Sequence, residues 1–157
     1  MLEPKIVIRV LGKTDLAVLE RVWPDVFDAP ISQRWAEEFL ADVRHHLVVA
    51  IKGDVVVGFA SAVHYVHPDA APQLFINQVG VAPALQRHGV GTQLMQALLA
   101  RGHELGCHEA WLGTEHDNLA ARGLYRALGG IEEEFVMVSF DLHNALETTS
   151  SADNKLR

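Results

Sequence analysis

The chain has one cysteine, Cys107, among its 157 residues. A single cysteine forms no intrachain disulfide, and a cysteine-rich zinc site is excluded because it needs several thiolates. Long apolar runs are also missing, since the longest, 47–63, is interrupted by Lys52 and Asp54. Nothing here is apolar enough to span a bilayer, and residues 1–5 do not have the layout of a signal peptide. We therefore expect a cytoplasmic protein, in a reducing compartment, that does not enter membranes.

Positive charge is scarce. Lys and Arg total 13 against 20 Asp and Glu, which gives a formal net charge of -7. Proteins that bind nucleic acid or anionic membranes without specificity need a basic surface, so we expect neither partner. The acidic balance suits a cationic partner instead. Apolar residues make up 49% and charged residues 21%, as in an ordinary globular chain of one domain.

Strand-like and helix-like segments alternate along the chain, which predicts an α/β fold with a mixed sheet. Lys52, Gly53 and Asp54 predict a hairpin turn between two strands. Ser32 predicts a helix start, with Trp35, Phe39 and Leu40 facing inward. We expect one domain over 1–142 and a polar, disordered tail over 143–157. Strands are predicted at 5–11, 46–51, 55–65, 73–81, 110–114 and 134–142, and helices at 15–22, from Ser32, at 90–105 and at 119–128.

The segment 79–92 has the composition of an anion-binding turn between a strand and a helix. Gly89 and Gly91 allow close approach of the backbone to a ligand. The free N–H groups of a first helical turn attract anions, and Arg87 adds a fixed positive charge. A pyrophosphate group fits this arrangement.

Two common phosphate motifs do not match. A dinucleotide fingerprint needs glycine three positions after Gly91, where the chain has Leu94. Gly12-Lys13-Thr14 imitates the end of a Walker A loop, but the glycine required five residues earlier is Val7. What remains is a Q-x-x-G-x-G pattern at 86–91, which on its own is also compatible with a plain strand–helix turn.

A second block, N-x-x-A-x-x-L-Y-x-x-x-G over 118–129, follows about 27 residues after the glycines. Together the two blocks resemble the GNAT family of acetyl-CoA-dependent N-acetyltransferases. The resemblance implies an acyltransferase fold with a splayed central sheet and acetyl-CoA (coenzyme A) as the cofactor. It assigns coenzyme binding to Val79, Gly80, Val81, Gln86, Arg87, His88, Gly89, Val90, Gly91, Thr92, Asn118, Ala121 and Tyr125.

The resemblance also implies direct attack of an amine on the thioester. Backbone N–H groups near Val79 and Val81 would polarise the thioester carbonyl, and Tyr125 would protonate the leaving thiolate. A core tyrosine is the alternative interpretation of Tyr125. Amines are largely protonated at neutral pH, so a base is required; Glu115 is the first candidate and His116 the second.

Two residues near the expected slot qualify this mechanism. Gln78 is neutral, although many members of the family have a carboxylate at this position. Glu115 has an alternative structural role as an ion-pair partner of Arg122 or Arg126. Gln78 therefore cannot act as the base that the family pattern would place at this position, and the role is expected to fall to Glu115.

Within the family, segments 74–77, 124–129 and 132–140 resemble the aminoglycoside 3-N-acetyltransferase group. The resemblance implies that the chain acetylates an aminoglycoside antibiotic, at its 3-amino group. Aminoglycosides are polycations, which a slot edged by carboxylates would attract. The alternatives are another small amine, a protein N-terminus as acceptor, or a non-catalytic coenzyme A-binding module. A homodimer is a further candidate implied by the resemblance. Candidate substrate residues are Asp25, Asp28, Asn77, Gln78, Glu115, Asp117, Glu133 and Glu134, with Glu132 beside them.

Nine histidines raise the question of a metal site. His45 and His46 are neighbours in a predicted strand and so face opposite sides of the sheet. His64 and His67 lie at a strand end without an evident third ligand. We therefore predict no metal, and expect His64, Tyr65 and His67 to line the slot or a dimer surface. Tryptophans 23, 35 and 111 are expected to be core or interface anchors.

Overall fold

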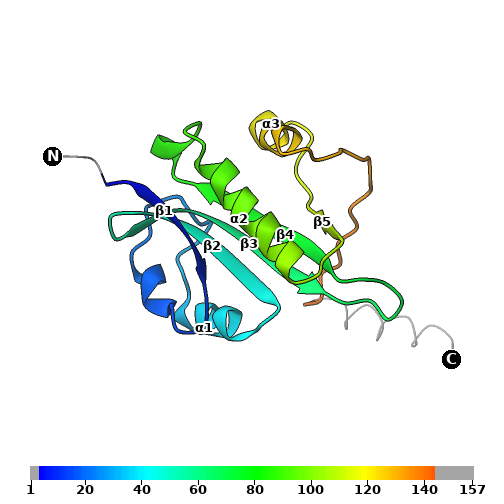
Figure 1. The fold of residues 1–157 in the computed structure, drawn as a ribbon, viewed down its shortest axis with the longest axis horizontal. Helices are drawn as coiled ribbons and strands as arrows, with labels where there is room; N and C mark the ends of the chain where they lie inside the picture. The colour runs from blue at the N-terminus through cyan, green and yellow to red at the C-terminus, as the bar shows by residue number, and fades with distance from the viewer. Residues whose placement is uncertain (1–3, 144–157) are drawn as a thin grey trace, which may run out of the picture.

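The computed structural model describes residues 4–143 and is built on a five-stranded sheet in the order β1-β2-β3-β4-β5. Figure 1 shows the strands side by side in chain order, with α2 lying across them. The strands are β1 Ile6–Leu11, β2 His45–Lys52, β3 Val55–Tyr65, β4 Gln73–Val81 and β5 Glu109–Trp111. The helices are η1 Leu16–Glu20, α1 Gln33–Ala41, η2 Pro83–Leu85, α2 Val90–Glu104 and α3 Leu119–Ala127.

The strand pairing confirms the predicted mixed α/β fold. Strands β1 to β4 pair antiparallel, and β4 pairs with β5 in parallel. The predicted hairpin joins β2 to β3, and Gly53 adopts the positive φ of +68° that its turn requires. The predicted helix start is also confirmed, since the Ser32 side chain accepts a hydrogen bond from the backbone N–H of Trp35.

Helix α2 covers one face of the sheet, and the chain before α1 covers the other. A Cβ on Gly58 would lie 3.2 Å from Leu94 of α2. Its neighbour Phe59 points to the opposite face, where its ring stacks on Phe27 at 3.8 Å between centroids. Residues 46–50 and 56–62 are consequently buried on both faces, which explains their nearly unbroken apolar sequence.

Strand β4 carries a bulge that reverses which side chains face α2. Ser61 pairs with Gln78, but the next pair is Ala62 with Ile76, so Asn77 is an extra residue. Before the bulge Leu74 packs against α2; after it, Val81 does. The bulge therefore turns Gln78 and its alternate neighbour Gly80 toward the other face.

The sheet splays after the bulge, as the predicted fold requires. Strand β5 pairs with β4 only over Gln73–Phe75. From Ile76 onward, β4 has no strand neighbour on its β5 side among residues 4–143. In an antiparallel strand every second residue points its backbone groups away from its partner, so the outer edge of 76–81 offers hydrogen-bonding groups to a ligand.

Three predicted elements were wrong in extent or existence. The helix predicted over 15–22 is only the 3-10 turn η1, because Arg21 and Trp23 exchange backbone hydrogen bonds with Val56 of β3. The strand predicted over 110–114 ends at Trp111, because β4 diverges there. The strand predicted over 134–142 does not form, because no partner strand lies beside it within the described chain.

Several large apolar side chains are exposed, among them one that the sequence predicted to face inward. Trp35 is 60% exposed rather than inward, whereas Leu40 of the same helix is buried. The segment 131–142, which mixes apolar and acidic residues, is also exposed along its length, with Val136 at 87%. The predicted tail, apart from His143, lies outside the described residues. None of the helices in 4–143 combines the length and apolar character needed to cross a bilayer.

Candidate functional site

A cavity of about 260 Å³ opens where β4 and β5 diverge. One wall is the outer part of β4, another is the chain after β5, and a third is one face of α3. Its lining comprises Val26, Asp28, Phe59, Ile76, Asn77, Gln78, Val79, Gly80, Leu112, Gly113, Thr114, Glu115, Asn118, Ala121 and Tyr125. The fold thus brings together β4 and the second sequence block, which lie about 40 positions apart in the chain.

The turn after β4 is held by its own polar groups. The Gln86 side chain donates to the carbonyl of Val81 at 3.1 Å, and His88 Nδ1 lies 2.8 Å from the Gln86 carbonyl oxygen. Arg87 has φ +63° and Gly89 φ +81°. These two left-handed residues, separated only by His88, turn the chain tightly before α2, and the Arg87 side chain lies on the surface.

Helix α2 begins without a side-chain cap at Gly89. The first helical hydrogen bond runs from Gln93 N–H to the Gly89 carbonyl at 3.1 Å. The N–H groups of Val90, Gly91 and Thr92 therefore have no helical acceptor and are directed out of the helix end, where an anionic group is stabilised. Gly91 also permits close packing, because a Cβ there would lie 3.3 Å from Leu124 of α3.

Helix α3 turns one face toward the cavity. The Asn118 side chain caps the helix by accepting from Ala121 N–H at 3.2 Å. Asn118, Ala121 and Tyr125 follow at helical spacing and all line the cavity. Burial raises the pKa of the Tyr125 phenol, so the hydroxyl stays protonated at neutral pH. That hydroxyl has no hydrogen-bond partner within residues 4–143, which leaves it available to a ligand.

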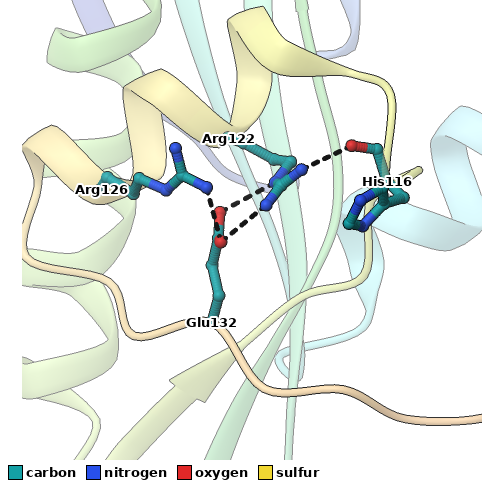
Figure 2. Close-up of polar contacts among 4 residues, drawn as sticks. All are labelled: His116, Arg122, Arg126 and Glu132. Carbon is teal, nitrogen blue, oxygen red and sulfur yellow. Dashed lines mark hydrogen bonds and ion pairs between the residues drawn. The ribbon is translucent and has the colours of Figure 1, made fainter.

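Glu115 lines the cavity, and the ion pair expected as its alternative role does not form. Arg122 and Arg126 instead bind Glu132, at 2.9 and 2.7 Å, and hold its pKa at about 2 (Figure 2). Arg122 also donates to the His116 carbonyl at 2.6 Å. These contacts tie the chain after α3 to the loop after β5. Within the described chain they leave Glu115 free of an ion pair, facing the cavity.

The remaining predicted site residues divide into two groups. Asp28, Asn77 and Gln78 line this cavity, and Asp25 lines a second one beside it. His116, Asp117, Glu133 and Glu134 are exposed and line neither cavity. Sequence reasoning missed the apolar wall formed by Val26 and Phe59. Gly80 is the one sequence feature that could have indicated this wall. Only glycine fits there, because a Cβ at position 80 would lie 2.5 Å from the Val26 carbonyl oxygen.

Two histidines from different predicted strands are in contact within the sheet. His46 Nε2 lies 2.7 Å from His64 Nδ1, across β2 and β3. Burial lowers the pKa of His46 to about 4, so the His46 ring is neutral at physiological pH. Neither His64 nor Tyr65 lines the cavity between β4 and α3. The Tyr65 hydroxyl instead donates a hydrogen bond to Gln73 and accepts one from Trp111. In residues 4–143 no group of three or more His, Cys, Asp or Glu could hold a metal ion.

Comparisons with known proteins agree with this geometry. The family model for the acetyltransferase (GNAT) family matches residues 16–129. Aminoglycoside N(6')-acetyltransferase type 1 of Salmonella enteritidis is 30% identical over 139 residues, covering 83% of this chain and 94% of the relative. The solved structure of aminoglycoside N-acetyltransferase AAC(6')-Iy in complex with CoA has a TM-score of 0.70 at 29% identity. It covers 90% of this chain and 97% of that chain.

A relative with a different acceptor also matches. N-alpha-acetyltransferase RimI of Mycobacterium tuberculosis is 32% identical over 106 residues, covering 64% of this chain and 63% of the relative. The similarity therefore extends beyond one substrate class, and the acceptor has to be argued from the residues that line the cavities.

Proposed function

Because this chain belongs to the acetyltransferase (GNAT) family and is an acetyl-CoA-dependent N-acetyltransferase, we propose that it acetylates an aminoglycoside. We favour the 6'-amino group. The 3-amino position expected from the sequence is not supported, since the relative in Salmonella acts as an N(6')-acetyltransferase. The observation that carries the proposal is the charge of the cavity: its charged lining residues are Asp28 and Glu115, both carboxylates. A polycationic acceptor fits such walls.

The chain's own residues divide the reaction between them. Acetyl-CoA supplies the activated acetyl thioester. The free N–H groups of Val90, Gly91 and Thr92 bind its pyrophosphate, with Arg87 nearby. Backbone N–H groups on the open edge of β4, at Val79 and Val81, bind the pantetheine arm and stabilise negative charge that develops on the thioester oxygen.

Proton transfers are assigned to two side chains on opposite walls. Glu115 accepts a proton from the acceptor's ammonium group, directly or through one water, so that the nitrogen lone pair can attack the acetyl carbon. As the new C–N bond forms and the C–S bond breaks, Tyr125 donates its proton to the leaving sulfur. The nitrogen then loses its second proton to water to give the neutral amide, and Tyr125 and Glu115 regain their starting protonation states by exchange with solvent. His116 is the weaker candidate for the base, because its side chain does not line the cavity.

The experiment that tests this function measures thiol release from acetyl-CoA with a panel of amines. The panel contains kanamycin, gentamicin, spermidine, free amino acids and short peptides. Saturable turnover with the aminoglycosides supports the proposal. Turnover restricted to peptides would favour acetylation of a protein N-terminus, the second candidate suggested by the similarity to RimI. The proposed compartment is the cytoplasm, where acetyl-CoA is available.

We also propose that the protein is a homodimer in which the exposed apolar segment 131–142 packs against the same segment of a second copy. The large apolar side chains of this segment are 65% to 90% exposed. A continuous surface of this kind suits an interface, and a stable one buries ~800 Å² per partner. The exposed apolar residues are Ile131, Phe135, Val136, Met137, Val138, Phe140 and Leu142.

The molar mass in solution is measured by light scattering after size-exclusion chromatography. We expect a mass of about twice 17.3 kDa for the native chain. The double variant Val138→Asp/Phe140→Asp should run as a folded monomer, because two buried charges would oppose the interface. A native chain that is monomeric at micromolar concentration would contradict the dimer.

A further inference from the structure

A second cavity, of about 410 Å³, adjoins the acetyl-transfer cavity, and Asp28 lines both. We propose that Asp28, held in place by Gln78, selects which amine of a multiply charged acceptor reaches the thioester, while the second cavity binds the rest of that acceptor. This inference rests on the proposed function, because it concerns the acceptor of the same reaction.

The second cavity lies in the segment between η1 and α1. That segment is fixed to the sheet, because Val56 N–H donates to the Arg21 carbonyl and Trp23 N–H donates to the Val56 carbonyl, both at 2.8 Å. The stacking of Phe27 on Phe59 of β3 is a second contact that holds this segment against the sheet. The cavity wall is therefore attached to β3 rather than being a loose loop. It is lined by Glu20, Val22, Trp23, Pro24, Asp25, Phe27, Asp28, Ala29, Pro30 and Ile31.

Asp28 is joined to the active-site strand by one hydrogen bond. Gln78 Nε2 donates to Asp28 Oδ2 at 3.0 Å. Gln78 points to this side of the sheet only because the bulge at Asn77 reverses the alternation of β4. The amide of Gln78 occupies one carboxylate oxygen and leaves the other free for an ammonium group. The carboxylate at this position therefore comes from Asp28 in the loop before α1, and the neutral Gln78 amide on β4 orients it.

The lining indicates the chemistry of the ligand. Glu20, Asp25 and Asp28 are the charged residues of the second cavity, and Trp23 and Phe27 are its aromatic ones. Carboxylates bind ammonium groups, and aromatic faces attract cations and the C–H faces of sugar rings. An amino sugar carries both features on one ring. The two cavities together reach the range of ~300–1,000 Å³ found for small-molecule sites. The ligand class is a multiply charged amino sugar, with one amine in the first cavity.

The test compares variants of Asp28 and Gln78 with one multiply charged acceptor, kanamycin. Asp28→Asn should raise the KM for kanamycin about tenfold, which is the range for loss of one hydrogen bond to a charged group, and leave the KM for acetyl-CoA unchanged. Gln78→Leu should raise the same KM by about threefold. The double variant should resemble Asp28→Asn alone, because Gln78 acts only through Asp28. The matched control is Asp69→Asn, an exposed carboxylate that lines neither cavity.

Direct binding separates this inference from the proposed function. Calorimetry with kanamycin is carried out on the complex with coenzyme A, for native chain and Asp28→Asn. Binding that weakens about tenfold in the variant supports the inference even when turnover is absent, in which case only the proposed function fails. Equal binding by both proteins, additive effects of the two substitutions, or no kanamycin binding by the native chain would overturn the inference.

Discussion

Replacing Tyr125 with Phe is expected to lower kcat by about 10²-fold or more, within the ~10²–10⁴ range of general acid catalysis. The substitution removes one oxygen from a half-buried side chain whose hydroxyl has no partner in the described chain, so the fold loses no hydrogen bond. Burial raises the pKa of this phenol, which keeps the proton in place through the neutral range. Stopped thiol-release assays at saturating acetyl-CoA measure the effect.

The chain offers a matched control in its only other tyrosine. Tyr65 bridges Gln73 and Trp111 outside the cavity. Tyr65→Phe should therefore affect stability modestly and leave kcat near the native value. Calorimetric binding of acetyl-CoA should be equal in all three proteins. If Tyr125→Phe turned over at the native rate, the proton for the leaving thiolate would have to come from water.

Replacing Glu115 with Gln is expected to lower kcat/KM by about 10²-fold near neutral pH, because the acceptor's ammonium then loses its proton acceptor. The deficit should shrink as the pH rises toward the ordinary pKa of the amine, where deprotonated acceptor is already present in solution. A pH profile of kcat/KM between roughly 6 and 10 measures this slope for native and variant protein.

Glu104→Gln is the control for this experiment. Glu104 lies at the end of α2, pairs with Arg101 at 3.2 Å and lines neither cavity. It should give the native profile. A Glu115→Gln profile parallel to the native one across the whole range would exclude Glu115 as the base. His116→Asn, which changes the second candidate, would then be the next variant to measure.

The elements that form the proposed coenzyme site could be predicted from the sequence because they are local. The turn at 86–91 and the helical spacing of Asn118, Ala121 and Tyr125 depend on backbone conformation and on one helix face. Local geometry of this kind is encoded by glycine, capping residues and helical period. The predictions placed these elements within a few residues of their positions in the structure.

The proposed acceptor site could not be predicted in the same way, because it depends on contacts between residues that are distant in sequence. Asp28 and Gln78 are 50 positions apart, and only the unpredicted bulge at Asn77 turns Gln78 toward the loop. The strand predicted over 134–142 was wrong for a related reason. Its apolar residues have the composition of a buried strand, but a strand also requires a neighbour, and composition does not specify one.

The central claim is acetylation of a 6'-amino group, and one pair of acceptors tests it most directly. Neomycin and paromomycin share their ring system, but paromomycin carries a hydroxyl at the 6' carbon where neomycin carries the amine. Initial rates of thiol release are measured with each at equal concentration and saturating acetyl-CoA. Turnover of neomycin with a rate for paromomycin at the background level is the predicted result. Equal rates would contradict the 6' position, and background rates with both would contradict an aminoglycoside acceptor.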